Sequence, residues 1–233
     1  MDYTMTPLGD SAVLLQFGSG ISREMNEQVQ IAAAALEASP FKGMKELIPA
    51  FSTLAVEYDP VLVNDPFPYE AVKVIIKDTL QKAKGIHTSL SKTVKIPVCY
   101  ESPFAMDLDV LSQHTGLSVS EIISLHTSAD YYVYFLGFAP GFPFLGGMPE
   151  KLAMPRKASP REKIPAGSVG IAGSQTGVYP IETPGGWQII GRTPLQFFDP
   201  ENEEPVLISP GDTVNFYPIS KEDYDEYVRG EKR

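Results

Sequence analysis

Apolar and polar residues are patterned differently in the two halves of the chain, and the first half opens on an apolar run. Residues 11–17 (SAVLLQF) are bounded by Gly9 and Gly18, which predicts a buried strand. Residues 22–39 then place apolar side chains at helical spacing behind a serine, and Pro40 follows. Because serine caps helix N-termini and proline cannot continue a helix, this segment is predicted to be an amphipathic helix.

The pattern that follows predicts a hairpin, a second helix and another strand. Residues 45–51 and 53–59 are apolar runs on either side of a short polar break, and Pro49 favours an edge strand. Residues 68–85 place apolar side chains on one helical face and end at a glycine. Residues 92–100 have the pattern of a further strand. The order strand, helix, strand, strand, helix, strand predicts a ferredoxin-like α/β sandwich.

Two short helices are predicted after Tyr100. Asp107 precedes LDVLSQHT as a candidate cap, and Ser118 with Glu121 forms a Ser-x-x-Glu capping box. The pair has the outline of a helix-turn-helix. Its second segment, VSEIISLHTS, lacks the Arg, Lys, Asn and Gln side chains that read bases, so DNA binding is not expected.

From residue 130 onward the chain consists of short apolar runs separated by glycine and proline. Twelve of the 21 prolines fall between residues 140 and 210. Many short strands with turn signals between them predict an antiparallel barrel or sandwich. The predicted fold class is therefore α+β, with an N-terminal α/β domain over residues 1–91 and a C-terminal β-barrel domain over residues 92–233.

Composition and charge indicate which cellular compartment and which kinds of partner are expected. The formal net charge is −10 and there is no long basic tract, so neither nucleic acid nor an anionic membrane is expected as a partner. The single cysteine, Cys99, cannot form an internal disulfide and is expected in the core of a reduced, cytoplasmic protein. The start does not fit a signal peptide, and the prolines and glycines of the uncharged run 131–149 argue against a membrane helix.

Several motifs of enzyme chemistry are missing from the sequence. There is no Gly-x-x-x-x-Gly-Lys phosphate loop, no Gly-x-Gly-x-x-Gly fingerprint and no Gly-x-Ser-x-Gly elbow. His87, His114 and His126 lack the spacing of zinc ligands, so no metal site is predicted. His126 is the best histidine for acid–base chemistry, although a surface or capping role is favoured. GIAGSQTG could form an anion-binding nest, although barrel corners are the favoured interpretation.

A basic segment stands out from this acidic protein. Residues 151–163 carry five basic side chains against one acid. Arg156 and Arg161 each follow a proline, and a guanidinium can bind a carboxylate or phosphate through two hydrogen bonds. Arg192 is a third candidate. Solvated loop charges are an equally good interpretation of the same pattern.

Aromatic residues are concentrated beside the Gly/Pro corners. The aromatic candidates for a cleft are Phe138, Phe142, Phe144, Tyr179 and Trp187. Side chains on such loops often project into a cleft, although core packing explains any one of them equally well. Gln175 and Tyr179 could supply uncharged hydrogen bonds beside the arginines.

Residues 137–194, from GFAPGFPFLGG to QIIGRTP, closely resemble the signature of the allophanate hydrolase subunit 1 family, also called the carboxyltransferase domain subdomain C and D proteins. The resemblance extends to PLGDSAVLLQFG (7–18), IPAFSTLAVEYDP (48–60) and KIPVCY (95–100). Within that family the chain is similar to the members that act as B subunits of 5-oxoprolinase and to the KipI-type inhibitors of sporulation kinases. The serine-rich amidase signature suggested by the name allophanate hydrolase is absent.

The resemblance implies a fold, a reaction and a set of partners. The implied fold is an N-terminal α/β domain followed by a cyclophilin-like β-barrel. The implied reaction is the ATP-dependent opening of 5-oxoproline to glutamate, with ATP as co-substrate and with separate A and C subunits as partners, in a complex whose B subunit is inactive alone. A carboxylate substrate and a phosphorylated intermediate both suit an arginine-lined cleft. The residues carried over as cleft candidates are Arg156, Arg161, Gln175, Tyr179, Trp187 and Arg192.

Two other functions stay open at this point. The inhibitor members suggest that the barrel domain binds the dimerisation helices of a sensor histidine kinase, since an aromatic, Gly/Pro-rich surface suits a helical partner. Prolyl isomerase activity is suggested only by the expected cyclophilin-like fold, and a fold alone does not determine function. Catalytic residues are not identified by the sequence.

Overall fold

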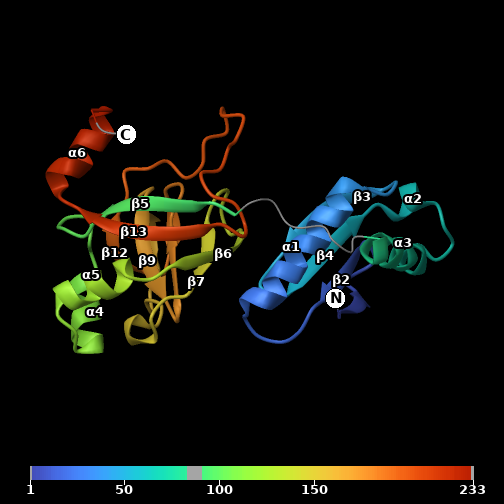
Figure 1. The fold of residues 1–233 in the computed structure, drawn as a ribbon, viewed down its shortest axis with the longest axis horizontal. Coiled ribbons are helices and arrows are strands. Elements are labelled where there is room, and N and C mark those ends of the chain that lie inside the picture. The colour runs from blue at the N-terminus through green and yellow to red at the C-terminus, as the bar shows by residue number, and fades with distance from the viewer. Residues whose placement is uncertain (1, 83–90, 232–233) are drawn as a thin grey trace. The chain divides into compact units, whose positions relative to one another are not determined.

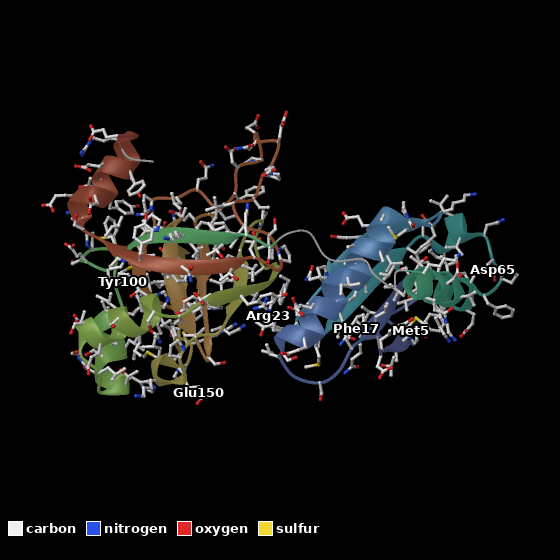
Figure 2. The ribbon with its side chains drawn as sticks, viewed as in Figure 1. Met5, Phe17, Arg23, Asp65, Tyr100 and Glu150 are labelled. Atoms are coloured by element: carbon white, nitrogen blue, oxygen red, sulfur yellow. The ribbon has the colours of Figure 1, made fainter. Side chains whose placement is uncertain are left out.

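The chain forms two compact units, Met1–Ser91 and Lys92–Arg233 (Figure 1). The computed structural model describes residues 2–82 and 91–231. Each unit has its own hydrophobic core, with Phe17 buried in the first and Tyr100 in the second (Figure 2). Within the described ranges, no helix is both long enough and apolar enough to span a membrane.

The first unit is a four-stranded antiparallel sheet with helices packed against it. The strands lie in the order β1-β2-β4-β3. Their bounds are β1 Thr4–Pro7, β2 Ala12–Gln16, β3 Met44–Pro49 and β4 Thr53–Tyr58. The helices are α1 Arg23–Ala38, α2 Pro60–Val63 and α3 Pro68–Lys82.

Local sequence signals account for most of this unit. The Ser22 hydroxyl accepts a hydrogen bond from Met25 N and caps α1 as predicted. Helices α1 and α3 bury the apolar faces that their spacing predicted. The β3–β4 hairpin is confirmed, and β3, with Pro49 at its end, is an edge strand. Gly85, the expected end of the second helix, and His87 lie outside the described residues.

The expected ferredoxin-like connectivity is not observed. Residues 93–99 do not join this sheet; they form β5 in the second unit. The second edge position is taken by β1, which pairs with β2 through a short connection around Gly9, where φ is 66°. A local hairpin closes with little loss of chain entropy, whereas the predicted return strand requires a distant pairing. The hairpin therefore completes the sheet from the N-terminal side.

The second unit is built on a closed seven-stranded barrel in the order β10-β7-β6-β13-β5-β12-β9. The strands are β5 Thr93–Cys99, β6 Tyr131–Leu136, β7 Pro143–Gly146, β9 Ser168–Ala172, β10 Gln175–Val178, β12 Gln188–Arg192 and β13 Thr213–Ile219. The barrel is confirmed, but it is not wholly antiparallel, because β5 and β13 pair in parallel. These strands are far apart in sequence, so no hairpin fixes their relative direction.

Short elements surround this barrel. They are the helices α4 Leu108–Thr115, α5 Val119–Thr127 and α6 Lys221–Arg229, the 3₁₀ turn η1 Glu150–Leu152, and the ribbon of β8 Arg161–Ile164 with β11 Thr183–Gly185. The Ser118–Glu121 capping box is present as predicted. Asp107 occupies the N-cap position of α4, but its side chain makes no capping hydrogen bond.

Among the described residues, His126 is a histidine buried in the barrel unit, and the expected surface role for it is wrong. His126 is fully buried on α5. Its Nε2 lies 3.0 Å from Thr176 Oγ1, and the Thr176 hydroxyl donates to Gly170 O. The imidazole therefore donates from Nε2 and accepts from the Tyr100 hydroxyl at Nδ1, 2.8 Å away. Burial lowers the pKa of His126 to about 3, so this ring is neutral and holds core elements together.

Candidate functional site

An aromatic pocket lies in the barrel unit, beside the β8–β11 ribbon. Its volume is about 280 Å³. It is lined by Phe138, Phe142, Phe144, Arg156, Pro160, Tyr179, Pro184, Gly185, Gly186 and Trp187. Phe142, Tyr179 and Trp187 belong to a small buried cluster separate from the main barrel core. All the aromatic candidates named from the sequence therefore meet in one place.

Glycines make room for these rings. Gly170 on β9 and Gly177 on β10 lie opposite one another in the sheet. A Cβ at Gly177 would lie 3.1 Å from Phe142 Cζ and 3.1 Å from the Trp187 ring, and a Cβ at Gly170 would lie 3.1 Å from Trp187 Cβ. These distances are shorter than ordinary carbon contacts, so a side chain at either position would displace the rings. The glycine-rich sequence thus serves the aromatic packing.

Phe142 is the centre of the aromatic cluster. Its ring meets those of Tyr179 and Trp187 edge to face, at centroid distances of 5.3 and 5.4 Å. The Phe138 ring meets it in the same way, at 5.4 Å. Edge-to-face contacts fix ring orientation as well as burying area, so the pocket walls are rigid where these rings touch.

Phe138 is the exception among these rings. It is 66% exposed, and its φ of 66° lies in the left-handed region that residues with a side chain rarely adopt. Such a conformation costs on the order of 1 kcal/mol or more and concentrates at functional sites. The lip of the pocket is therefore a large apolar ring held exposed by a strained backbone.

Arg156 is the charged side chain among the described residues that line the pocket. Of the six arginines in the sequence, five fall in the described part of the chain. Arg23, Arg161, Arg192 and Arg229 each donate to a protein oxygen. Within those described ranges Arg156 makes no hydrogen bond or ion pair, and its side chain is exposed. Its guanidinium is therefore available to an anion.

The Tyr179 hydroxyl is a further polar group in the lining. Burial raises the pKa of Tyr179 to about 12, against smaller opposing effects from the Trp187 backbone hydrogen bond and the charges of Arg156 and Arg161. The phenol is thus protonated at neutral pH. A protonated phenol can donate its proton to a ligand oxygen.

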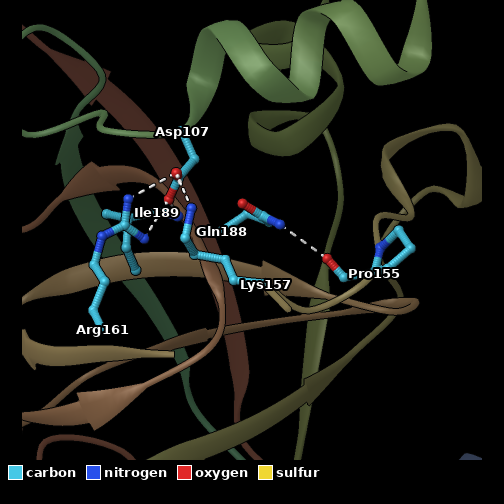
Figure 3. Close-up of polar contacts among 6 residues, drawn as sticks. All are labelled: Asp107, Pro155, Lys157, Arg161, Gln188 and Ile189. Atoms are coloured by element: carbon cyan, nitrogen blue, oxygen red, sulfur yellow. Dashed lines mark hydrogen bonds and ion pairs between the residues drawn. The ribbon is translucent and has the colours of Figure 1, made fainter. Parts of the chain in front are cut away.

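Asp107 anchors the loop that carries Arg156 through the polar contacts drawn in Figure 3. This residue is 2% exposed. Arg161 donates to both carboxylate oxygens, each at 2.8 Å. Lys157 Nζ donates to one of these oxygens at 3.1 Å, and Ile189 N donates to the other at 2.7 Å. Burial raises the pKa of Asp107, but the donors from Arg161, Ile189 and Lys157 outweigh it and the pKa is lowered. Each oxygen accepts two hydrogen bonds, so this is a satisfied buried carboxylate.

Arg156 itself is held between tethered neighbours. Gln188 Nε2 donates to Pro155 O at 3.0 Å, and Lys157 N donates to Gly186 O at 2.7 Å (Figure 3 shows the first of these). Just before them, Met154 forms a β-bridge with Gly173. The backbone on both sides of Arg156 is therefore fixed, while its side chain makes no bond within the described residues.

The structure does not bring the three candidate arginines together in the lining of this pocket. The Arg161 guanidinium is occupied by Asp107. Arg192 Nε donates to Ala166 O at 2.8 Å, and its guanidinium lies over the Phe104 ring. Gln175 begins β10 opposite Ala172 and is not among the residues lining the pocket. Of the polar candidates, Arg156 and Tyr179 line it.

Sequence reasoning missed Asp107 as an ion-pair partner and Pro160, Pro184, Gly185 and Gly186 as pocket walls. The only available signal at Asp107 was its place before a helix, which pointed to a cap instead. Within the described residues, no group of three or more His, Cys, Asp or Glu side chains is placed to hold a metal ion.

The sequence matches the family described as "Carboxyltransferase domain, subdomain C and D" over residues 3–208. It is 48% identical over 233 residues to the B subunit of 5-oxoprolinase from Bacillus subtilis, covering 97% of this chain and 96% of that protein. It is 41% identical over 214 residues to the corresponding 5-oxoprolinase chain of Escherichia coli O157:H7, covering 91% and 94% respectively.

Solved structures agree with this relationship. PH0987 from Pyrococcus horikoshii, a conserved uncharacterized protein, is 46% identical with a TM-score of 0.56, and the match covers 95% of this chain and 100% of that one. TTHA0988 is 37% identical with a TM-score of 0.76, covering 90% of this chain and 40% of that one. The urea amidolyase of K. lactis, at 20% identity and a TM-score of 0.76, shares the fold. The chain belongs to the carboxyltransferase domain, subdomain C and D family.

Proposed function

We propose that this chain is the B subunit of a 5-oxoprolinase that opens 5-oxoproline to glutamate at the expense of ATP. The observation that carries the proposal is 48% identity to the B subunit of a 5-oxoprolinase over nearly the full length of both proteins. Two further bacterial proteins of that name are 41% and 35% identical over about nine-tenths of this chain. The pocket candidates Arg156, Tyr179 and Trp187 lie inside the matched range.

The reaction has a clear chemical requirement. In 5-oxoproline the ring amide is stabilised by resonance, so water attacks it slowly. Transfer of a phosphoryl group from ATP to the amide oxygen would create a leaving group. Water then adds to the activated ring carbon and the C–N bond breaks, so that the nitrogen leaves as the amine of glutamate and an acyl phosphate remains. A second water hydrolyses the acyl phosphate to the carboxylate and inorganic phosphate. The proposal assigns the ATP site to no residue of this chain.

Partner chains are part of the proposal. The letter B in the relatives' name implies companion chains, and we propose that they are the A and C subunits and that the chain is inactive alone. The match to TTHA0988 covers only 40% of that chain, so the homologous region there is joined to a longer remainder. In TTHA0988 the homologous region and the remainder are parts of one chain, which supports the proposal that this fold acts beside another polypeptide segment.

The test is reconstitution. We expect that this chain, mixed with its A and C partners, 5-oxoproline and ATP, forms ADP and glutamate in equal amounts, and that omitting any one chain abolishes both. A full mixture in which 5-oxoproline does not stimulate ADP formation contradicts the proposal. If the same preparation then blocks autophosphorylation of a purified sensor histidine kinase, kinase inhibition replaces it as the function.

A further inference from the structure

The aromatic pocket has the chemistry of a specific small-molecule site. Its walls are aromatic rings, prolines and glycines, and among the described residues Arg156 is the only charged side chain that lines it. A volume of about 280 Å³ admits a single small ring. Flat apolar walls favour a flat ligand, and the available guanidinium at the rim favours a ligand with one anionic group.

The polar groups narrow the class of ligand further. Arg156 offers two parallel N–H donors, which fit a carboxylate. Tyr179 offers one O–H donor from inside the pocket, which fits a carbonyl oxygen. A triphosphate is a poor match, because one arginine would face several negative charges within mostly apolar walls.

We infer that this pocket binds a small cyclic amide carrying a carboxylate, with Arg156 on the carboxylate, the Tyr179 hydroxyl on the ring carbonyl, and Phe138, Phe142 and Trp187 around the ring. The inference rests on the proposed function for its choice of 5-oxoproline within that class. The tethers at Pro155 and Lys157 hold the Arg156 backbone in place before a ligand arrives. Phe138, strained and exposed at the lip, contacts the ligand from the solvent side.

The chain carries its own reporter for this site. Trp187 is the only tryptophan in the sequence, and it lines the pocket. We expect its fluorescence to change saturably when 5-oxo-L-proline is added to the isolated chain. Two analogues test the carboxylate contact and the carbonyl contact separately. 2-Pyrrolidone lacks the carboxylate, and L-proline lacks the ring carbonyl.

Variants then test each contact. Arg156→Ala should weaken 5-oxoproline binding at least about tenfold, the scale of a lost charge-assisted hydrogen bond, and should leave 2-pyrrolidone binding unchanged. Arg156→Lys should restore part of the loss. Tyr179→Phe should weaken binding about threefold to tenfold and should leave L-proline binding unchanged. Arg229→Ala, an exposed arginine on α6, is the matched control and should have no effect.

In the assembled enzyme the same variants should raise KM for 5-oxoproline by similar factors, with the KM for ATP unchanged. If the enzyme is active and both Arg156→Ala and Tyr179→Phe leave the 5-oxoproline KM within twofold, the site assignment is overturned while the proposed function stands. If no mixture of the subunits hydrolyses 5-oxoproline, the fluorescence titration of the isolated chain becomes the test of the site. A saturable Trp187 response that depends on Arg156 then supports the site without the function, and a missing response overturns the site as well.

Discussion

At the scale of single residues, His126 is a titratable group enclosed in an apolar core. Its ring stacks on Phe216 at a centroid distance of 4.7 Å and is bonded at both nitrogens. Burial lowers the pKa of His126 from the ordinary 6.5 to about 3. Between these two values the unfolded chain binds a proton that the folded chain does not. Stability is therefore fully present above pH 6.5 and is lost as the pH falls toward the folded pKa.

We predict that protonation linked to His126 lowers the free energy of unfolding by about 1.4 kcal/mol for each pH unit below pH 6.5. His126→Gln, which removes the titration, should be less stable at pH 7.5 but should show a flatter profile between pH 7 and pH 5. Urea denaturation at half-unit pH steps measures both curves. Parallel profiles for the two proteins would mean that His126 is not the group responsible.

The arginines show where residue-level prediction from sequence stops. Arg156 and Arg161 lie in the same basic segment, each behind a proline, and no local feature separates them. What separates them is Asp107, 54 positions before Arg161 and brought to it by the fold. Pairing across such distances depends on tertiary structure, so the sequence could identify the segment but could not select the available guanidinium.

At the scale of elements, the segment between η1 and β8 depends on one buried carboxylate. Asp107 joins α4 to Lys157, Arg161 and the Ile189 amide on β12. The side chains of Arg161 and Lys157 are 24% and 28% exposed, so water can partly solvate them if Asp107 is removed. The loss is therefore smaller than for a fully enclosed ion pair.

We predict that Asp107→Ala lowers the free energy of unfolding by about 1–3 kcal/mol. The loosened loop should also be cleaved faster by trypsin after Arg156 or Lys157. Glu182→Ala is the matched control, because its ion pair with Lys163 is 3.3 Å long and lies between side chains that are 57% and 79% exposed. That variant should change stability by no more than about 0.5 kcal/mol. Equal effects from both variants would contradict an anchoring role for Asp107.

Elements with local signals were predictable, and elements with distant partners were not. Helix α1 begins after the predicted cap, and the β3–β4 hairpin lies where the polar break placed it. The strand at residues 93–99 was also predicted, but its partners were not, because it pairs with β13 and β12 far along the chain. Apolar patterning specifies that a segment forms a strand; the sheet it joins is decided by packing.

At the scale of the whole molecule, the two units have separate hydrophobic cores. One core collects Val13, Leu15, Val56 and the buried faces of α1 and α3. The barrel core collects residues from position 96 onward, and the aromatic cluster from position 142 onward. Among the described residues, none is shared between the clusters. Separate cores allow each unit to fold by itself.

We predict that a fragment of residues 92–233 folds alone and retains the full response of Trp187 to 5-oxoproline, because the residues lining the pocket all lie within it. Circular dichroism and amide NMR dispersion measure the folding, and the fluorescence titration measures the site. Arg156→Ala in the fragment should weaken binding by the same factor as in the full chain. A folded fragment with an altered response would show that the removed residues, 1–91, affect the ligand site. An unfolded fragment would show that the barrel core requires the first unit, so either result would contradict independence. If the prediction holds, residues 92–233 are sufficient for binding of 5-oxoproline.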